Sequence, residues 1–173
     1  MIITDFTADK EFANTARKLI ERDLYPCLSY LGRFVSINGS SSGSDYLQRN
    51  AHIDAVLQST VGASLTVEEK IVRKRYDAFA IETNSNVGAA GRADGWLYTS
   101  TADLLLYAFT IPGGLDCWLM SLPALRELVS ARVGTYRATY SASGWGGQGK
   151  YTSRCVLVPI IDVPNKRFFE LMW

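Results

Sequence analysis

The chain has 173 residues, of which 47% are apolar and 12% aromatic, and this is enough hydrophobic material to close one core. Its 18 basic and 17 acidic residues leave a formal net charge of +1, which excludes a strong overall positive field as the means of attracting nucleic acid. Any basic binding surface must therefore be local.

The cysteines and the apolar runs indicate where the protein works. Cys27, Cys117 and Cys155 are odd in number, widely spaced and without a CxxC pair, which favours a reduced cytosolic setting over a disulfide or zinc framework. The first residues are polar and acidic, so we expect no secretory signal. The longest apolar runs, 104–109 and 156–161, are too short to span a bilayer. We therefore expect a soluble cytoplasmic protein of a prokaryotic or phage-infected cell, with no membrane partner.

The first predicted element is a helix over residues 7–30. Its apolar residues recur at spacings of three and four, which gives one apolar stripe: Phe12, Ala16, Leu19, Ile20, Leu24 and Leu28. Pro26 lies inside this pattern and should kink or split the helix near Leu24. The Gly- and Ser-rich run 38–44 then predicts a loop.

After this loop the hydrophobic period changes from helical to two. Strands are predicted over 52–57, 65–72 and 78–83, and their short connections predict an antiparallel meander. Residues 84–95, rich in Gly, Asn and Ala, predict a long loop. The almost continuous apolar run 102–111 is typical of a strand that is buried on both faces.

The last third predicts a helix, a loop and a terminal strand or two. Ser121 and Pro123 favour a helix start, and the helix should continue to about Arg132. Residues 141–150 predict a loop, and 151–161 predict a strand. The apolar tail of the chain, 155–173, must be buried within one chain or in a homodimer. The whole order predicts one α/β domain over 1–173, with a mixed sheet flanked by helices.

Three polar residues on the first two predicted strands carry the candidate chemistry. Glu68 and Lys70 are two positions apart and so project from the same face of a strand. Asp54 precedes Glu68 by fourteen positions, and a hairpin can bring the two carboxylates together. Because two adjacent carboxylates repel each other unless a cation lies between them, this pattern predicts a site for Mg²⁺ or Mn²⁺.

Asp54 followed by Glu68-x-Lys70 on the next strand resembles the signature of the PD-(D/E)XK nuclease superfamily, which has a restriction-endonuclease-like fold. The order of a helix, a three-stranded meander, and a further helix and strand also resembles that family. Residues 76–82 and 95–107 look similar to small phage and bacterial members, and the resemblance covers roughly 5–132. The sequence departs from the family motif at Ile53, where the motif has proline.

The resemblance implies a metal-dependent nuclease that hydrolyses phosphodiester bonds, with DNA as the expected substrate and a 5′-phosphate left on the product. Asp54 and Glu68 would hold Mg²⁺ or Mn²⁺ with the backbone carbonyl of Glu69, and Lys70 would position or polarise the attacking water. Many members also use an acidic residue of the first helix. Glu11 and Glu21 are the candidates here, and Glu21 lies nearer the middle of the helix.

Four basic residues are candidates for contacts with phosphates: Arg73, Lys74, Arg75 and Lys150. A solvated charged turn explains the first three equally well. Gly88, Gly91 and Gly95 match neither a Rossmann nor a Walker spacing, so nucleotide hydrolysis is not supported and we expect the glycines to provide flexibility. The competing hypothesis is a catalytically inactive nuclease fold that binds nucleic acid or a protein partner.

Overall fold

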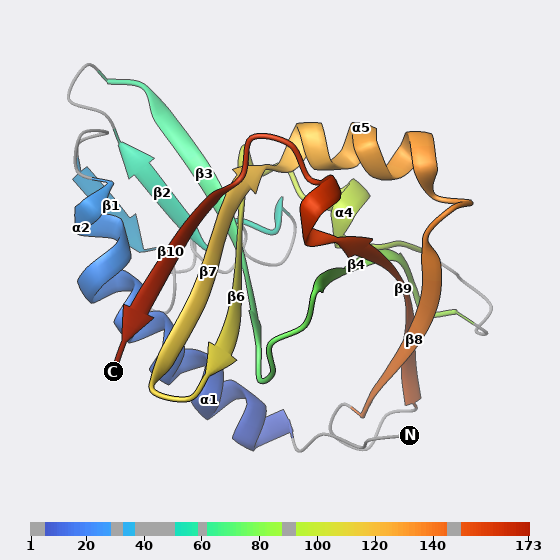
Figure 1. Cartoon of the computed structure of the whole chain (residues 1–173), viewed down its shortest axis with the longest axis horizontal. Helices are drawn as coiled ribbons and strands as arrows, with labels where there is room; N and C mark the ends of the chain where they lie inside the picture. Colours follow the sequence, from blue (N-terminus) through green and yellow to red (C-terminus); the bar gives the residue numbers. More distant parts are fainter. Residues whose placement is uncertain (1–5, 29–32, 37–50, 59–61, 88–92, 145–149) are drawn as a thin grey trace.

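A computed structural model describes residues 6–28, 33–36, 51–58, 62–87, 93–144 and 150–173, and every structural statement below concerns these residues. They form two β-sheets with a helix on the outer face of the larger sheet and a second helix beside the junction of the sheets (Figure 1). None of the described helices is both long enough and apolar enough to cross a bilayer.

The N-terminal helical segment changes its geometry where the sequence predicts a break. Helix α1 covers Phe6–Leu19, a π-helical turn η1 covers Ile20–Leu24, and the short α2 covers Tyr25–Cys27. The Tyr25 N–H donates to the Ile20 carbonyl, which is the wider hydrogen-bond step of a π turn. Pro26 has no N–H with which to continue the ladder. The predicted helix and its break near Leu24 are confirmed.

The larger sheet has six strands in the order β1-β2-β3-β6-β7-β10. These strands are β1 Arg33–Ser36, β2 Ala55–Gln58, β3 Ser64–Val72, β6 Leu104–Ile111, β7 Gly114–Ser121 and β10 Arg167–Met172. β3 and β6 run parallel and the other pairs are antiparallel, so the sheet is mixed. Pro112 and Gly113 connect β6 to β7, and Gly113 has the positive φ of +87° that such a tight turn requires.

The smaller sheet has four antiparallel strands in the order β5-β4-β9-β8. They are β4 Ala78–Ser85, β5 Ala93–Asp94, β8 Arg137–Gly144 and β9 Lys150–Pro159. Three short helical elements complete the fold: α4 Trp96–Thr99, α5 Leu122–Arg132 and the 3₁₀ turn η4 Ile160–Asp162. Ser121 caps α5 as predicted, because its Oγ accepts a hydrogen bond of 3.3 Å from the Ala124 N–H.

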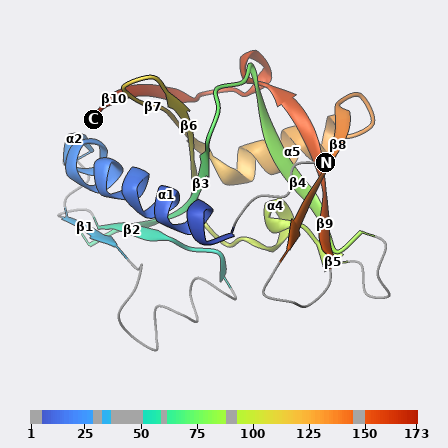
Figure 2. The ribbon, with the colours of Figure 1, turned by 90° about the horizontal axis from the view of Figure 1, so that it is seen from below.

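Two apolar clusters lie on opposite faces of the larger sheet. One packs α1 and η1 against the sheet and includes Leu19, Leu24, Val67 and Leu106. The other joins the two sheets to α4 and α5 and includes Phe79, Tyr107, Phe109, Leu125 and Val156. The rings of Phe79, Tyr107 and Phe109 lie 4.9 to 5.8 Å apart between centroids. β3 therefore lies between α1 on one side and the smaller sheet on the other (Figure 2).

The expected α/β class and the mixed sheet are confirmed, but the three-stranded meander is wrong in its third strand. β2 and β3 form the predicted antiparallel pair, whereas β4 belongs to the other sheet. A strand has two edges, and those of β3 are used by β2 and by the buried β6. The β3–β4 connection therefore leads β4 away to pair with β9.

Other differences concern loops and the C-terminal end. The predicted loop at 141–150 is wrong over 141–144, which continue β8, while 145–149 lie outside the described residues. The predicted loop at 84–95 contains the short β5, and the predicted loop at 38–44 is not described. The end of the apolar tail forms β10 at one edge of the larger sheet (Figure 1). Phe168 and Met172 on this strand are about half exposed. The homodimer stays a prediction.

Candidate functional site

Asp54 lies opposite Glu68, one residue before β2 begins. In the β2–β3 register Ala55 lies opposite Val67, and the Asp54 N–H donates to the Val67 carbonyl at 2.8 Å, so Asp54 continues the ladder opposite Glu68. The Asp54 carboxylate then turns along the edge of β3, where its Oδ2 accepts a hydrogen bond of 2.9 Å from the Glu69 N–H. The β2–β3 hairpin thus fixes the Asp54 carboxylate beside the strand that carries Glu68 and Lys70.

The side chain of Glu69 lies on the opposite face of β3 and is fully engaged there. Its carboxylate is 2.6 Å from Nε of Arg17 and 2.5 Å from the hydroxyl of Tyr25, both on the N-terminal helical segment. Burial raises the pKa of Glu69, and the Arg17 guanidinium partly offsets that rise. Because the N–H and C=O of one strand residue point to the same side, the Glu69 carbonyl shares the edge occupied by Asp54. Only this backbone oxygen of Glu69 could serve as a metal ligand.

Glu68 and Lys70 form an ion pair on the face of β3 that looks toward the smaller sheet, with Nζ of Lys70 against Oε1 of Glu68. The Glu68 side chain is only 3% exposed, and burial raises its pKa from the ordinary 4.5 to about 7, against the opposing effect of Lys70. Asp54 adds to this rise by repulsion between the carboxylates. Burial lowers the pKa of Lys70, but Glu68 outweighs it and the net pKa is raised, so Lys70 stays charged.

Trp96 covers Lys70 from the neighbouring α4 helix. The Lys70 ammonium lies 5.0 Å from the centroid of the indole ring, within cation–π range. The preceding residue, Gly95, donates its N–H to the Thr83 carbonyl at 3.0 Å. A Cβ at Gly95 would lie 2.5 Å from the Glu82 carbonyl oxygen. The expectation that Gly95 provides flexibility is therefore wrong: the glycine permits close packing that places Trp96 over Lys70.

The donor types beside β3 suit a hard divalent cation. Asp54 and Glu68 supply carboxylates and Glu69 a carbonyl, and Mg²⁺ binds through one or two carboxylates while keeping several waters. The described residues contain no group of three or more His, Cys, Asp or Glu side chains that could hold a metal. The described residues therefore do not form a metal site in which side chains supply all the ligands. Two carboxylates and one carbonyl, completed by waters, would still suit Mg²⁺.

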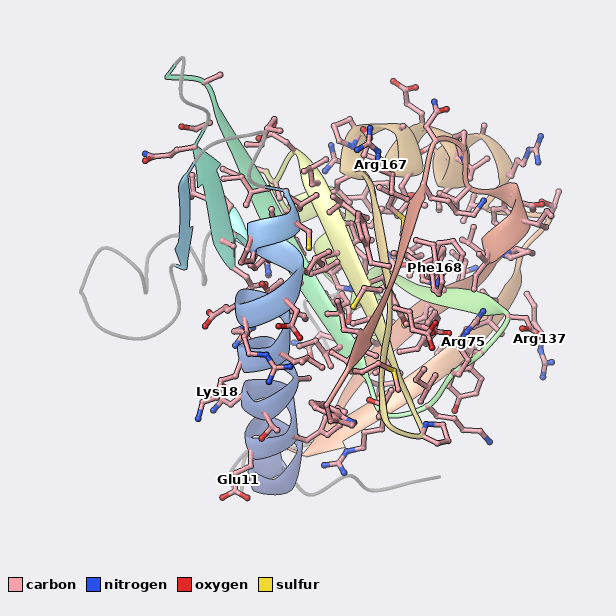
Figure 3. The ribbon with its side chains drawn as sticks, turned by 60° about the vertical axis from the view of Figure 1, so that its left-hand side comes forward. Glu11, Lys18, Arg75, Arg137, Arg167 and Phe168 are labelled. Carbon is pink, nitrogen blue, oxygen red and sulfur yellow. The ribbon has the colours of Figure 1, made fainter. Side chains whose placement is uncertain are left out.

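Helix α1 contacts this site through a basic residue, and the role of its acidic candidates is untested. Arg17 makes that contact, since its Nη2 lies 3.6 Å from Oδ1 of Asp54 in addition to the Glu69 ion pair. Glu11 is exposed near the outer end of α1 (Figure 3). Glu21 is half-buried in η1, and its role stays a prediction.

The three cations that follow β3 point to different partners. Nε of Arg75 lies 2.8 Å from Oδ2 of Asp116, and its guanidinium lies 5.1 Å from the centroid of the Phe109 ring, so Arg75 fastens the turn to β6 and β7 (Figure 3). Arg73 lies over the ring of Phe12 at 4.8 Å. Lys74 is exposed and lies 5.8 Å from the ring of Tyr76. Arg73 and Lys74 are both exposed, and their contacts with phosphate stay a prediction. Lys150 begins β9, and its side chain lies outside the described residues.

Sequence reasoning missed Arg17 and Tyr25 as partners of Glu69, and Trp96 as the cover of Lys70. The sequence contained one signal that Arg17 is buried against the sheet. Positions 17, 20 and 24 fall on one helix face, and Ile20 and Leu24 are buried there. A cation in an apolar stripe indicates a buried acidic partner. His52 lies two residues before Asp54 with a φ of +49°, and its carbonyl accepts a hydrogen bond of 3.1 Å from Oγ of Ser100.

Comparison with known proteins identifies no relative. No protein-family model matches this sequence, and neither a curated protein nor a solved structure shows significant similarity to it. What can be inferred about function therefore rests on the residues and geometry of this chain.

Proposed function

We propose that the chain is a metal-dependent nuclease of the PD-(D/E)XK type that hydrolyses phosphodiester bonds, with DNA as the expected substrate. The observation that carries this proposal is the anchoring of the Asp54 carboxylate to the Glu69 N–H, opposite the ion pair of Glu68 with Lys70. The Asp…Glu-x-Lys pattern thus coincides with a spatial cluster. If the three residues were unrelated charged residues on solvent-facing strands, they would not need to lie close together.

The electrostatics of the cluster support a cation at this edge. Glu68 is buried beside Asp54, and its pKa is raised mainly by burial and further by the negative charge of Asp54, so an ionised Glu68 carries an energetic penalty there. Mg²⁺ or Mn²⁺ would remove that penalty by coordinating Asp54, Glu68 and the Glu69 carbonyl. When bound, the metal lowers the pKa of a coordinated water and neutralises charge on the phosphate. Lys70, held between Glu68 and Trp96, can donate a hydrogen bond that orients the water or the phosphate.

The arrangement of elements supports a restriction-endonuclease-like fold. Helix α1 packs on a mixed sheet, the β2–β3 hairpin carries Asp54, Glu68 and Lys70, and the parallel partner of β3 is the buried strand β6. Helix α5 follows β7 and packs beside the junction of the sheets. The position of β4 in a second sheet is a departure from the three-stranded meander that this fold implies.

A cleavage assay on a panel of single-stranded, double-stranded and branched DNA and RNA tests the proposal. We expect cleavage with Mg²⁺ or Mn²⁺ that is lost with chelator, in Asp54→Ala and in Lys70→Ala. Lys18→Ala, which removes an exposed lysine of α1, is the matched control and should cut normally (Figure 3). If the wild-type protein cuts no substrate with either metal, the nuclease proposal fails.

A titration with Mn²⁺ separates the enzyme from an inactive nuclease fold that only binds a partner. The nuclease should bind Mn²⁺ calorimetrically, and Glu68→Gln should abolish the signal because an amide is a poor ligand for a hard cation. Glu127→Gln, on the exposed face of α5, should leave the signal unchanged. Absence of Glu68-dependent binding would favour the binding module.

A further inference from the structure

A large apolar hollow lies at the junction of the two sheets, beside the candidate site. Its volume is about 650 Å³, within the range of roughly 300 to 1,000 Å³ for pockets that hold small molecules. Residues that line it come from five strands and the β3–β4 turn, and they include Val72, Tyr76, Ala78, Ala80, Tyr107 and Leu157. We call this hollow the junction pocket.

The junction pocket continues the face of β3 that carries Glu68 and Lys70. Val72 is two residues beyond Lys70 on the same strand and therefore projects from the same face. Tyr107 is the register partner of Lys70 on the adjacent β6. The pocket thus begins two strand positions from Lys70, the residue that the proposed function places at the scissile phosphate.

Small side chains on β4 make this hollow, and the surrounding structure fixes its walls. Ala78 and Ala80 face the pocket, whereas Phe79 and Ile81 project from the other face of β4 into the core. Leu157 lies opposite Ala80 on β9. The hydroxyl of Tyr107 accepts a hydrogen bond of 3.2 Å from the Ala80 N–H, which holds the tyrosine in place. The result is a preformed apolar wall on which a flat aromatic ring can lie.

The rim of the junction pocket joins an aromatic side chain to a cation. Tyr76 is 52% exposed although it lines the pocket, and Lys74 lies 5.8 Å from the centroid of its ring. Proteins that bind single-stranded nucleic acid combine aromatic rings that stack on bases with cations that contact the backbone. Thr139 adds a hydroxyl to the lining that could hydrogen-bond to the edge of a base.

We propose that the junction pocket binds one unstacked nucleobase of the strand being cut, so that the substrate is single-stranded or locally unpaired nucleic acid. This inference rests on the proposed function, because it assigns the pocket to the strand whose phosphate meets Lys70. A base within an intact duplex is stacked and paired, and removing it from the stack is unfavourable. The pocket therefore selects strands whose bases are already free.

Binding measured without cleavage tests the pocket separately from catalysis. Fluorescence anisotropy with labelled oligonucleotides in chelator should show tighter binding of a single strand than of its duplex. Moving one abasic site along the single strand should reveal a position where binding weakens about tenfold, the order expected for loss of one stacked base. Equal binding of single strand and duplex, or no sensitive position, overturns the proposal.

A variant that fills the pocket, compared with a matched control, tests which residues hold the base. Ala80→Leu places a larger side chain in the hollow and should remove the abasic-site effect, whereas Ala138→Leu, an exposed alanine of β8, should retain it. If Ala80→Leu does not fold, the pair Tyr76→Ala and Tyr76→Phe decides: only the alanine variant should lose about tenfold in single-strand affinity. Wild-type affinity in both Ala80→Leu and Tyr76→Ala overturns the assignment.

Two further outcomes separate this inference from the proposed function. Metal-dependent cleavage with no abasic-site effect would support the nuclease proposal and contradict base binding in the junction pocket. A base-dependent affinity without cleavage by any metal supports the pocket and overturns the nuclease. Binding of adenosine monophosphate is measured directly by calorimetry, and its binding without any binding of oligonucleotides would show a free-nucleotide site and overturn the strand assignment.

Discussion

The Glu69 N–H donates a hydrogen bond of 2.9 Å to Oδ2 of Asp54, so Asp54 has a structural role in addition to its proposed chemical one. Asp54→Ala leaves this N–H without its acceptor and should destabilise the metal-free protein by about 1–3 kcal/mol. Asp54→Asn retains an oxygen acceptor and should destabilise it by less. Urea unfolding in chelator measures both, and equal losses of unfolding free energy would contradict the anchoring role.

Arg17 neutralises a carboxylate that the fold buries. Arg17→Met leaves Glu69, whose side chain is 1% exposed, without a cationic partner beside the hydroxyl of Tyr25, and this should destabilise the protein by about 3–5 kcal/mol. Arg17→Met combined with Glu69→Met should recover much of the loss, because position 69 then no longer buries a charge without a cation beside it. Lys18→Met, on the exposed side of α1, is the control and should unfold close to the wild type in urea.

The Arg17→Met defect should also depend on pH. Burial already raises the pKa of Glu69, and loss of the Arg17 guanidinium raises it further, so the folded variant binds a proton more tightly than the unfolded chain. A carboxyl of this kind contributes stability at low pH that is lost as pH rises through its folded pKa. The difference in unfolding free energy between wild type and Arg17→Met should therefore be smaller at pH 5 than at pH 8. A larger difference at pH 5 would contradict this account.

Glu68 gives the metal-free protein a second pH dependence, of the same sign. Its pKa rises from 4.5 to about 7 on folding, so its contribution is full below about pH 4.5 and is lost as pH approaches and passes 7. In Glu68→Gln the fall in stability between pH 5 and pH 8 should be shallower than in the wild type. Urea midpoints in chelator across this range provide the measurement, and parallel profiles for the two proteins would exclude a perturbed Glu68.

Gly95 and Glu82 approach each other more closely than a side chain allows. Gly95→Ala forces its Cβ against the Glu82 carbonyl oxygen and should destabilise the protein by about 1–3 kcal/mol while displacing Trp96 from Lys70. Gly134→Ala is the control, since a Cβ there meets nothing within 4 Å. Thermal unfolding followed by tryptophan fluorescence reports both effects, and equal behaviour of the two variants would contradict the packing role of Gly95.

The parts of the fold that could be predicted from sequence are those governed by local patterns. The apolar stripe of α1, the break at Pro26, the cap at Ser121 and the buried run of β6 each depend on a few neighbouring residues. The position of β4 depends instead on competition for the edges of β3, which are used by β2 and β6. A short sequence connection between two strands does not reveal that competition.

The candidate site shows the same division. The shared face of Glu68 and Lys70 follows from strand alternation, and the return of Asp54 follows from the β2–β3 hairpin. The ion pair of Arg17 with Glu69 spans 52 positions of the chain, and its geometry depends on how α1 packs across the sheet. The engagement of Arg75 with Asp116 likewise needs β7 in place, so three consecutive cations looked equivalent in the sequence.

The most direct measurement of the central claim is single-turnover cleavage of a labelled single-stranded DNA with Mg²⁺ by wild type, Glu68→Gln and Glu127→Gln. The two variants make the same chemical change, one at the buried carboxylate opposite Asp54 and one on the exposed face of α5. The account predicts cleavage by wild type and Glu127→Gln at similar rates and a loss of at least about 100-fold in Glu68→Gln, the scale on which a catalytic group contributes. Cleavage by Glu68→Gln at the wild-type rate, or cleavage by the wild type that persists in chelator, would contradict it.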